Sequence, residues 1–176
     1  MILLRDAVPE DAESLARLGR DSFCHAFEHL YRPQDLQPFL EEVYSVEAVA
    51  REIADPGIRH QLTQDAPGAG PSAFIKVKYE SPYAEHSSAK NPLCLGQLYT
   101  DPARTGEGLG AALMDWCLDL AKQRGCDAVQ LSVYSDNHGA QRFYQRYGFG
   151  KIADIGFWVG EQRDHEFLYE LRLQGT

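Results

Sequence analysis

A glycine-rich stretch in the middle of the chain reads Asp101-Pro102-Ala103-Arg104-Thr105-Gly106-Glu107-Gly108-Leu109-Gly110. An apolar strand is predicted just before it, over 93–99, and apolar spacing at i, i+4, i+7, i+8 and i+11 from Leu109 predicts a helix over 108–124. Glycines let a backbone approach a phosphate closely, and the positive end of a helix dipole favours negative charge. The stretch therefore predicts a strand, an anion-binding loop and a helix in direct succession.

Two other interpretations compete for these glycines. A tight turn alone would need fewer glycines than the three at alternate positions. The spacing Gly106-x-Gly108-x-x-Ala111 also matches a dinucleotide-binding fingerprint, which expects a tight turn and an acidic residue ending the next strand. Here six residues separate Tyr99 from Gly106, and Asp127 precedes the next strand, so this interpretation fits poorly. The sequence Gly-x-x-x-x-Gly-Lys-Ser/Thr of a Walker loop does not occur.

A second motif reads Asn137-His138-Gly139-Ala140-Gln141-Arg142-Phe143-Tyr144-Gln145-Arg146-Tyr147-Gly148-Phe149. Its residues Ala140, Phe143, Tyr144 and Tyr147 have i, i+3, i+4 and i+7 spacing and share one face of a helix. Asn137 is suited to be the N-cap of that helix. Taken alone, the pattern favours an amphipathic helix with an aromatic stripe in the core.

The remaining segments alternate between strand and helix patterns. The sequence predicts a strand at 2–5, a helix ending at about Phe27, two short helices within 33–55, a hairpin of strands 58–63 and 73–79, an exposed loop at 81–92, and strands at 128–133, 149–158 and 166–173. This order indicates a mixed α/β fold without an internal repeat.

Length and composition set the class of protein. A chain of 176 residues, 44% apolar and 24% charged, fits one globular domain over 1–176. The net charge of -9 argues against nucleic acid or an anionic membrane as a partner. The four cysteines lack a Cys-x-x-Cys pair, and the apolar start Met1-Ile2-Leu3-Leu4 is too short for a signal peptide, so we expect a cytoplasmic protein with free thiols.

The two motifs in this order resemble the GNAT superfamily of N-acetyltransferases, and the opening Leu4-Arg5-Asp6-Ala7 is similar to the usual start of these proteins. The resemblance implies a twisted, mostly antiparallel sheet of six to seven strands with a V-shaped splay, flanked by four to five helices. It implies N-terminal and acceptor-side elements at 1–57 and an acetyl-coenzyme A-binding core at 93–150. Finer features, such as Ser22-Phe23 and Phe157-Trp158-Val159-Gly160, resemble the PaiA-like polyamine acetyltransferases and imply an acceptor such as spermidine or spermine.

The resemblance also implies roles for individual residues. Tyr144 matches the tyrosine that protonates the departing coenzyme A thiolate, after an amine attacks the acetyl group directly in a ternary complex. The residues expected to hold acetyl-coenzyme A are Leu98, Tyr99, Thr100, Arg104, Thr105, Gly106, Glu107, Gly108, Leu109, Gly110, Asn137 and Arg146. Those expected to contact the small-molecule amine are Phe27, Glu28 and Tyr31. No metal is expected, and the oligomeric state stays open between a monomer and a homodimer.

The sequence departs from the family pattern at two places. Thr105 stands where glutamine or arginine is common, so backbone amides from Gly106 to Gly110 should supply most of the pyrophosphate binding. Many relatives have a glutamate on the strand before the loop, whereas this chain has Gly96-Gln97-Leu98-Tyr99. The base that accepts the amine proton is therefore open among Glu28, His25, His29 and Asp101. The alternatives to polyamine acetylation are a protein N-terminus, amino acid or antibiotic as acceptor, or a regulatory module that only binds acetyl-coenzyme A.

Overall fold

The polypeptide is described here by a computed structural model covering residues 2–174, so the first position and the last two of the expected domain 1–176 lie outside the described part. Within it the chain forms one seven-stranded sheet and five α-helices. The strands are β1 (Leu3–Asp6), β2 (Ile58–Gln64), β3 (Ala73–Lys78), β4 (Pro92–Thr100), β5 (Ala128–Tyr134), β6 (Gly150–Val159) and β7 (Gln162–Arg172). The helices are α1 (Ala12–Phe27), α2 (Pro33–Tyr44), α3 (Val46–Ala54), α4 (Leu109–Gln123) and α5 (His138–Arg146).

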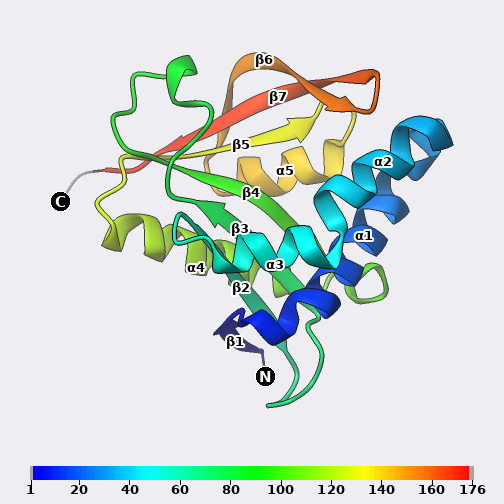
Figure 1. The fold of residues 1–176 in the computed structure, drawn as a ribbon. Coiled ribbons are helices and arrows are strands. Elements are labelled where there is room, and N and C mark those ends of the chain that lie inside the picture. The colour runs from blue at the N-terminus through cyan, green and yellow to red at the C-terminus, as the bar shows by residue number, and fades with distance from the viewer. Residues whose placement is uncertain (1, 175–176) are drawn as a thin grey trace.

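The sheet has the strand order β1-β2-β3-β4-β5-β7-β6. Every neighbouring pair is antiparallel except β4 and β5, which run parallel (Figure 1). The parallel pair needs a crossover connection, and α4 provides it. The mixed α/β fold with a mostly antiparallel sheet, predicted from the sequence, is confirmed.

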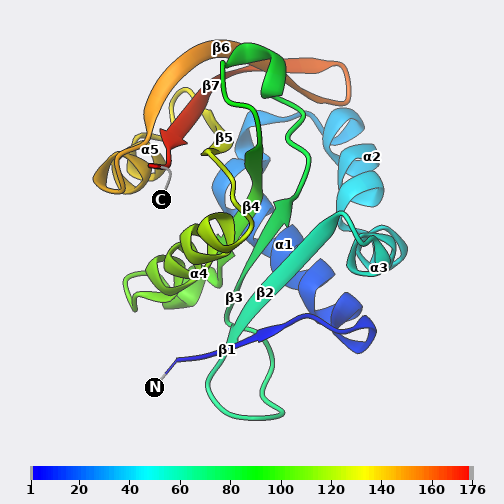
Figure 2. The same cartoon turned by 90° about the vertical axis from the view of Figure 1, so that its left-hand side faces the viewer.

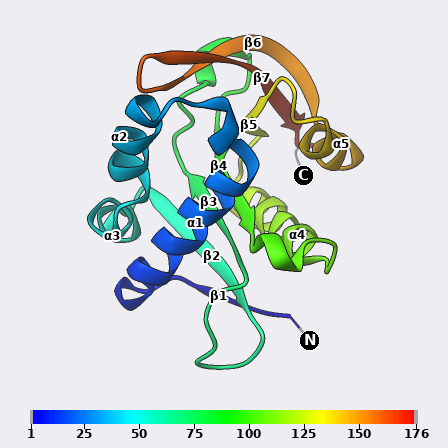
Figure 3. The ribbon, with the colours of Figure 1, turned by 90° about the vertical axis from the view of Figure 1, so that its right-hand side faces the viewer.

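Helices cover both faces of the sheet. Figure 2 shows α4 and α5 on one side and α2 and α3 on the other, and Figure 3 shows α1 lying over the second face. The core under α4 is apolar and almost without solvent exposure, and it includes Ile75, Val77, Leu93, Leu113, Met114 and Leu131. The core under α1, α2 and α3 includes Leu15, Leu40, Leu62 and Phe74. Both layers bury the apolar positions that the sequence periodicity marks, which is what holds the helices on the sheet.

The strands β4 and β5 part after a short paired segment. Their register covers only Pro92 to Cys94 against Ala128 to Gln130, and beyond it β4 has a partner on one edge only, namely β3. Figure 1 shows the two strands diverging from their paired ends. The register shift against Lys76 and Val77 also leaves Gly96 as a bulge in β4. The expected V-shaped splay is thus confirmed, and it opens the sheet at its centre.

Two segments differ from their predicted form. Strand β7 begins at Gln162, earlier than the predicted start at Glu166, because it forms a hairpin with β6 over polar residues that an apolar pattern does not mark. The predicted loop 81–92 is mostly exposed, yet it is tied to the sheet: Ser81 Oγ donates to Gln130 Oε1 at 2.6 Å, and the amides of Lys90 and Asn91 donate to the Asp127 carboxylate at 2.7 and 2.9 Å. Residues 2–174 contain no helix with the length and apolar character that a membrane span needs.

Candidate active site

A cavity of about 550 Å³ lies at the parted ends of β4 and β5. On one face of the sheet it is lined by α5, through Asn137, Ala140 and Tyr144. On the other face it is lined by the last turn of α1 and by β7, through Phe27 and Glu166. The cavity therefore passes between the two strands, and a molecule held on one face can meet a molecule held on the other.

The glycine loop leads into this cavity. Gly106 and Gly108 have φ values of 84° and 81°, a left-handed conformation that glycine adopts without the steric cost of a side chain. Gly108 is the N-cap of α4, and the first hydrogen bond of the helix runs from the Ala112 amide to the Gly108 carbonyl at 3.1 Å. The amides of the first helical turn thus have no partner within the helix. This turn fits an anion such as a pyrophosphate, as the sequence predicts.

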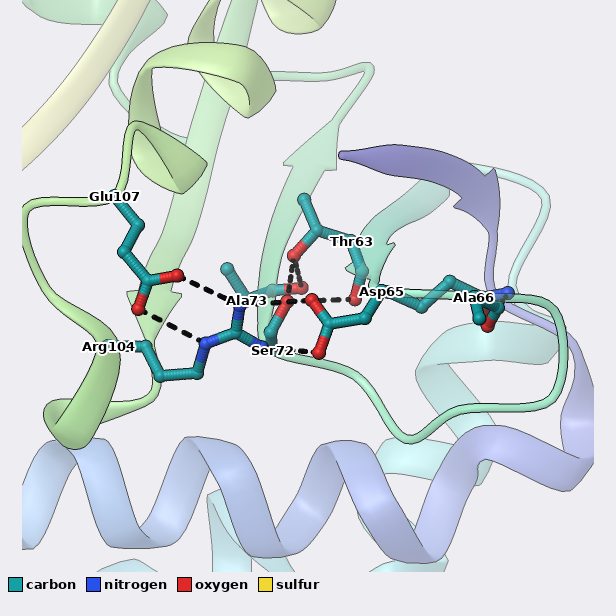
Figure 4. A network of polar contacts seen from close by, with 8 residues as sticks. Thr63, Asp65, Ala66, Ser72, Ala73, Arg104 and Glu107 are labelled. Atoms are coloured by element: carbon teal, nitrogen blue, oxygen red, sulfur yellow. Dashed lines mark hydrogen bonds and ion pairs between the residues drawn. The ribbon is translucent and has the colours of Figure 1, made fainter. Parts of the chain in front are cut away.

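Arg104 takes a position that the sequence did not reveal. Its guanidinium donates to both carboxylate oxygens of Asp65, at 2.8 and 2.9 Å, and to the Glu107 carboxylate at 2.9 and 3.2 Å (Figure 4). Asp65 follows β2, whose end is bound to the start of β3 by the Thr63 and Ser72 hydroxyls, 2.7 Å apart. The guanidinium, expected on a phosphate, is therefore engaged by two carboxylates in this structure. Its hydrogen bonds hold the pKa of Glu107 below the usual range.

The strand side of the cavity contains Leu98, Tyr99 and Thr100, as expected. At these positions the edge of β4 that faces away from β3 has no partner strand among the residues that the structure describes, so backbone groups on that edge are available to a ligand. The Thr100 carbonyl also accepts a hydrogen bond from Ser22 Oγ at 3.3 Å, which ties α1 to the end of the strand. Thr105 lines the same cavity, at the start of the glycine loop.

On α5, Tyr144 faces the cavity between two aromatic neighbours. Its ring lies edge-on to Phe143 and Phe149, with centroid distances of 5.4 and 5.8 Å. Burial raises the pKa of the Tyr144 phenol, so the hydroxyl stays protonated at neutral pH. Asn137 begins the helix by accepting the Ala140 amide on Oδ1 at 3.2 Å, as its predicted N-cap role requires.

Arg146 lies at the exposed end of α5. Its guanidinium carbon is 5.8 Å from the centroid of the Phe143 ring. That ring in turn lies against Gly110, where an added Cβ would be 3.7 Å from Cζ of the phenylalanine. Arg146 is thus on the side of α5 that faces the beginning of α4, where the expected phosphate site lies.

The three residues expected on the acceptor side are not brought together in the cavity. Phe27 lines it, whereas Glu28 is exposed and outside its walls. Tyr31 donates its hydroxyl to the Asp164 carboxylate and so links the segment after α1 to the β6–β7 hairpin. Of the candidate bases, His25 lines the cavity, and Asp101 instead accepts the Ala103 amide at 2.9 Å.

The cavity contains an acidic residue that the sequence did not single out. Glu166, on β7, lines it together with Tyr83, Ser132 and Tyr134. Burial raises the pKa of the Glu166 carboxyl, the charge of Asp164 raises it further, and the Ser132 hydroxyl acts in the opposite direction. The alternation of acidic residues along 162–172 is the signal that could have revealed it, because residues two apart on a strand share one face.

A family model described as the acetyltransferase (GNAT) family matches residues 25–149. The sequence is 24% identical over 165 residues, 93% of each chain, to an uncharacterized N-acetyltransferase from Lactobacillus delbrueckii subsp. lactis. It is 27% identical over 159 residues to the spermidine N(1)-acetyltransferase of Thermoplasma acidophilum, covering 87% of this chain and 90% of that one. The structure of PaiA N-acetyltransferase from Thermoplasma acidophilum in complex with coenzyme A is similar, with a TM-score of 0.78, 22% identity, and coverage of 98% of this chain and 99% of that one.

The matched range spans well over half of the sequence, so the chain belongs to the GNAT family of acetyltransferases. It is an N-acetyltransferase that uses acetyl-coenzyme A. The turn at the start of α4 leaves room for the coenzyme, because a Cβ added at Gly106 or Gly108 would meet no atom of residues 2–174 within 4 Å apart from those of its chain neighbours. The family resemblance predicted from the glycine loop and the Asn137 motif is thereby confirmed.

Proposed function

We propose that this enzyme acetylates a primary aliphatic amine of the polyamine type, such as spermidine or spermine, by direct attack within a ternary complex. The observation that carries the proposal is the cavity between β4 and β5, which joins the coenzyme side at Tyr144 to an acidic and aromatic side at Glu166. A carboxylate and aromatic rings are groups that attract an ammonium ion. The printed activity of one relative, spermidine acetylation, supports this choice of acceptor.

The coenzyme side would be built mainly from backbone. The free edge of β4 at Leu98, Tyr99 and Thr100 would hold the pantetheine arm, and the amides from Gly106 to Gly110 would hold the pyrophosphate. Acetyl-coenzyme A supplies the activated acetyl group. Asn137 lines the same cavity and would lie beside the arm, and Arg146 would contribute positive charge near the beginning of α4.

Tyr144 would protonate the departing thiolate. A phenol with a reference pKa of about 10 can donate to a thiolate with one of about 8.5. Burial keeps the Tyr144 phenol protonated before the reaction, and the same burial disfavours a free thiolate in the cavity. The proton is therefore available at the moment the carbon–sulfur bond breaks.

One observation favours a second kind of acceptor, an amine that also has a carboxylate, such as an amino acid or a peptide. Lys76 and Lys78 both line the cavity. Lys76 is paired with Glu52 at 2.7 Å, whereas Lys78 forms no ion pair with any residue in the range 2–174. A free ammonium group would attract a carboxylate and repel a second cation.

A panel of acceptor amines distinguishes polyamines from acceptors that also have a carboxylate. Spermidine, spermine, amino acids, short peptides and an aminoglycoside are incubated with acetyl-coenzyme A, and the acetylated products are identified by mass spectrometry. Polyamines should give the highest kcat/KM, and efficient turnover of another class with inactive polyamines would reject the assignment.

The variant Lys78→Gln makes the comparison sharper. For a polyamine, removing the cation should lower KM, because a repulsion is lost. For an acceptor with a carboxylate, the same change should raise KM. The direction of the change therefore reports which acceptor the cavity is built for.

A further inference from the structure

We infer that Glu166 is the catalytic base that accepts the proton of the acceptor amine, from a strand other than the one on which many relatives have their glutamate. The inference rests on the proposed function, since it concerns the same cavity. The sequence left the base that accepts the amine proton open among Glu28, His25, His29 and Asp101, and we assign this role to Glu166 instead.

The position of Glu166 on β7 singles it out from its acidic neighbours. Asp164, Glu166 and Glu170 alternate along the strand and share one face of the sheet. Asp164 is occupied by the Tyr31 hydroxyl and by Gln162 Nε2 at 2.9 Å.

Glu170 is occupied as well, by Gln130 Nε2 at 2.8 Å and by the Arg172 guanidinium at 3.0 Å. Glu166, between the two, forms no ion pair with any residue that the structure describes, and it is the one of the three that lines the cavity. Among these carboxylates it alone is placed to receive a proton from a bound molecule.

Tyrosine side chains from three different parts of the chain line the cavity together with this carboxylate. Tyr83 belongs to the loop before β4, Tyr99 to β4 and Tyr134 to β5, and all three line the cavity. Burial is the main cause that raises the pKa of each phenol, and the charge of Glu166 raises it further. Tyr144 lines the cavity as well, and the Tyr99 hydroxyl lies 2.8 Å from that of Tyr44. The proposed base Glu166 and the proposed acid Tyr144 therefore line one cavity, and Tyr99 lines it with them.

The environment of Glu166 suits a base rather than a permanent counter-ion. Burial and the charge of Asp164 raise its pKa, while the Ser132 hydroxyl stabilises the ionised form. A carboxylate with a raised pKa binds a proton more strongly than an ordinary carboxylate, which is what a general base requires. Burial in the cavity would favour the neutral form of a bound amine, and the carboxylate beside it would accept the proton.

The protons of the reaction balance with these two residues. Glu166 takes one proton from the ammonium group, and the freed lone pair attacks the acetyl carbon. The carbon–nitrogen bond forms and the carbon–sulfur bond breaks, while Tyr144 gives its proton to the sulfur. The second nitrogen proton returns to the tyrosinate, directly or through water, and Glu166 releases its proton to solvent.

The test compares Glu166→Gln and Glu166→Asp with the matched control Glu80→Gln, an exposed glutamate outside the cavity. For the best acceptor of the panel, kcat/KM is measured from pH 5.5 to 9.5, and acetyl-coenzyme A affinity is measured by calorimetry. Glu166→Gln should lower kcat/KM about 100-fold or more, the low end for a lost general base. It should also lose the acidic limb of the pH profile and retain coenzyme affinity.

Glu166→Asp should recover part of the activity, because the carboxylate is kept and only one methylene is lost. Glu80→Gln should behave like the wild type. The inference is overturned if Glu166→Gln stays within about threefold of the wild type with an unchanged pH profile. It is also overturned if Glu166→Asp is as inactive as Glu166→Gln while both variants melt like the wild type.

The outcome is independent of the acceptor assignment. If the wild type acetylates an amine outside the polyamines, the proposed acceptor is wrong, and the same three variants are then measured with that amine.

Discussion

Replacing His60 should make the stability of the fold less sensitive to acid. The imidazole is 5% exposed in the middle of β2, and its Nδ1 has no hydrogen-bond partner among residues 2–174. Burial is the main reason that its pKa falls from 6.5 to about 4; Lys76 lowers the pKa further, and Glu52 acts in the opposite direction. His60 is therefore neutral in the folded protein at a pH where it is charged in the unfolded chain.

The size and direction of the effect follow from these two pKa values. Above pH 6.5 His60 is neutral in both the folded and the unfolded protein, so it adds no pH dependence to the free energy of unfolding. Below it the unfolded chain binds the proton and the folded protein does not, so stability falls until the pH reaches about 4. With 1.36 kcal/mol per pKa unit, the loss from this residue between pH 7 and pH 5 is about 2 kcal/mol.

Urea unfolding at pH 7, 6 and 5, followed by tryptophan fluorescence, measures this loss. In His60→Leu the side chain cannot bind a proton, so the decrease in unfolding free energy over this range should be smaller by about 2 kcal/mol than in the wild type. The control His86→Gln changes an exposed histidine and should keep the wild-type decrease. An equal decrease in His60→Leu and wild type would refute the reasoning.

Two further predictions concern the glycine loop. Arg104→Met should weaken acetyl-coenzyme A binding because Glu107 would be left unpaired beside the pyrophosphate, and the double variant Arg104→Met/Glu107→Gln should restore the affinity in calorimetry. A double variant as weak as the single one would mean that Arg104 contacts the coenzyme itself. Gly108→Ala should destabilise the fold by about 1–2 kcal/mol in urea unfolding because its φ of 81° is left-handed, whereas Gly139→Ala, inside α5, should be neutral or slightly stabilising. Equal stability of the two alanine variants would contradict this explanation.

The helices at the two motifs could be predicted from the sequence because residues close together in the chain determine where they form. The apolar face of α4 is set by the spacing of residues from Leu109 to Leu120, and the N-cap of α5 by the Asn137 side chain. The splay of β4 and β5 was expected only through the family resemblance. Spacing within one strand does not say how far its pairing with another extends.

The parts that were missed depend on contacts between distant residues. Arg104 was predicted to be a phosphate ligand from its place beside the glycine loop. Its partner Asp65 lies 39 positions earlier in the chain and contacts it only once the β2–β3 hairpin has formed. Glu166 lies among polar residues in a strand whose beginning was not predicted. Its place in the cavity depends on its register opposite Tyr134. The contact between Arg104 and Asp65 leaves no local pattern in the sequence. The alternation of acidic residues along β7 indicates a shared face of the strand but not that this face lines a cavity.

The central claim is that Tyr144 supplies a proton to the coenzyme thiolate at the opening between β4 and β5. Its most direct test measures kcat and the acetyl-coenzyme A dissociation constant for Tyr144→Phe and for the control Tyr147→Phe. Tyr147 is the C-cap of the same helix and does not line the cavity. We expect Tyr144→Phe to lose about 100-fold or more in kcat with unchanged coenzyme affinity, and Tyr147→Phe to keep its turnover. Wild-type turnover by Tyr144→Phe would contradict the claim.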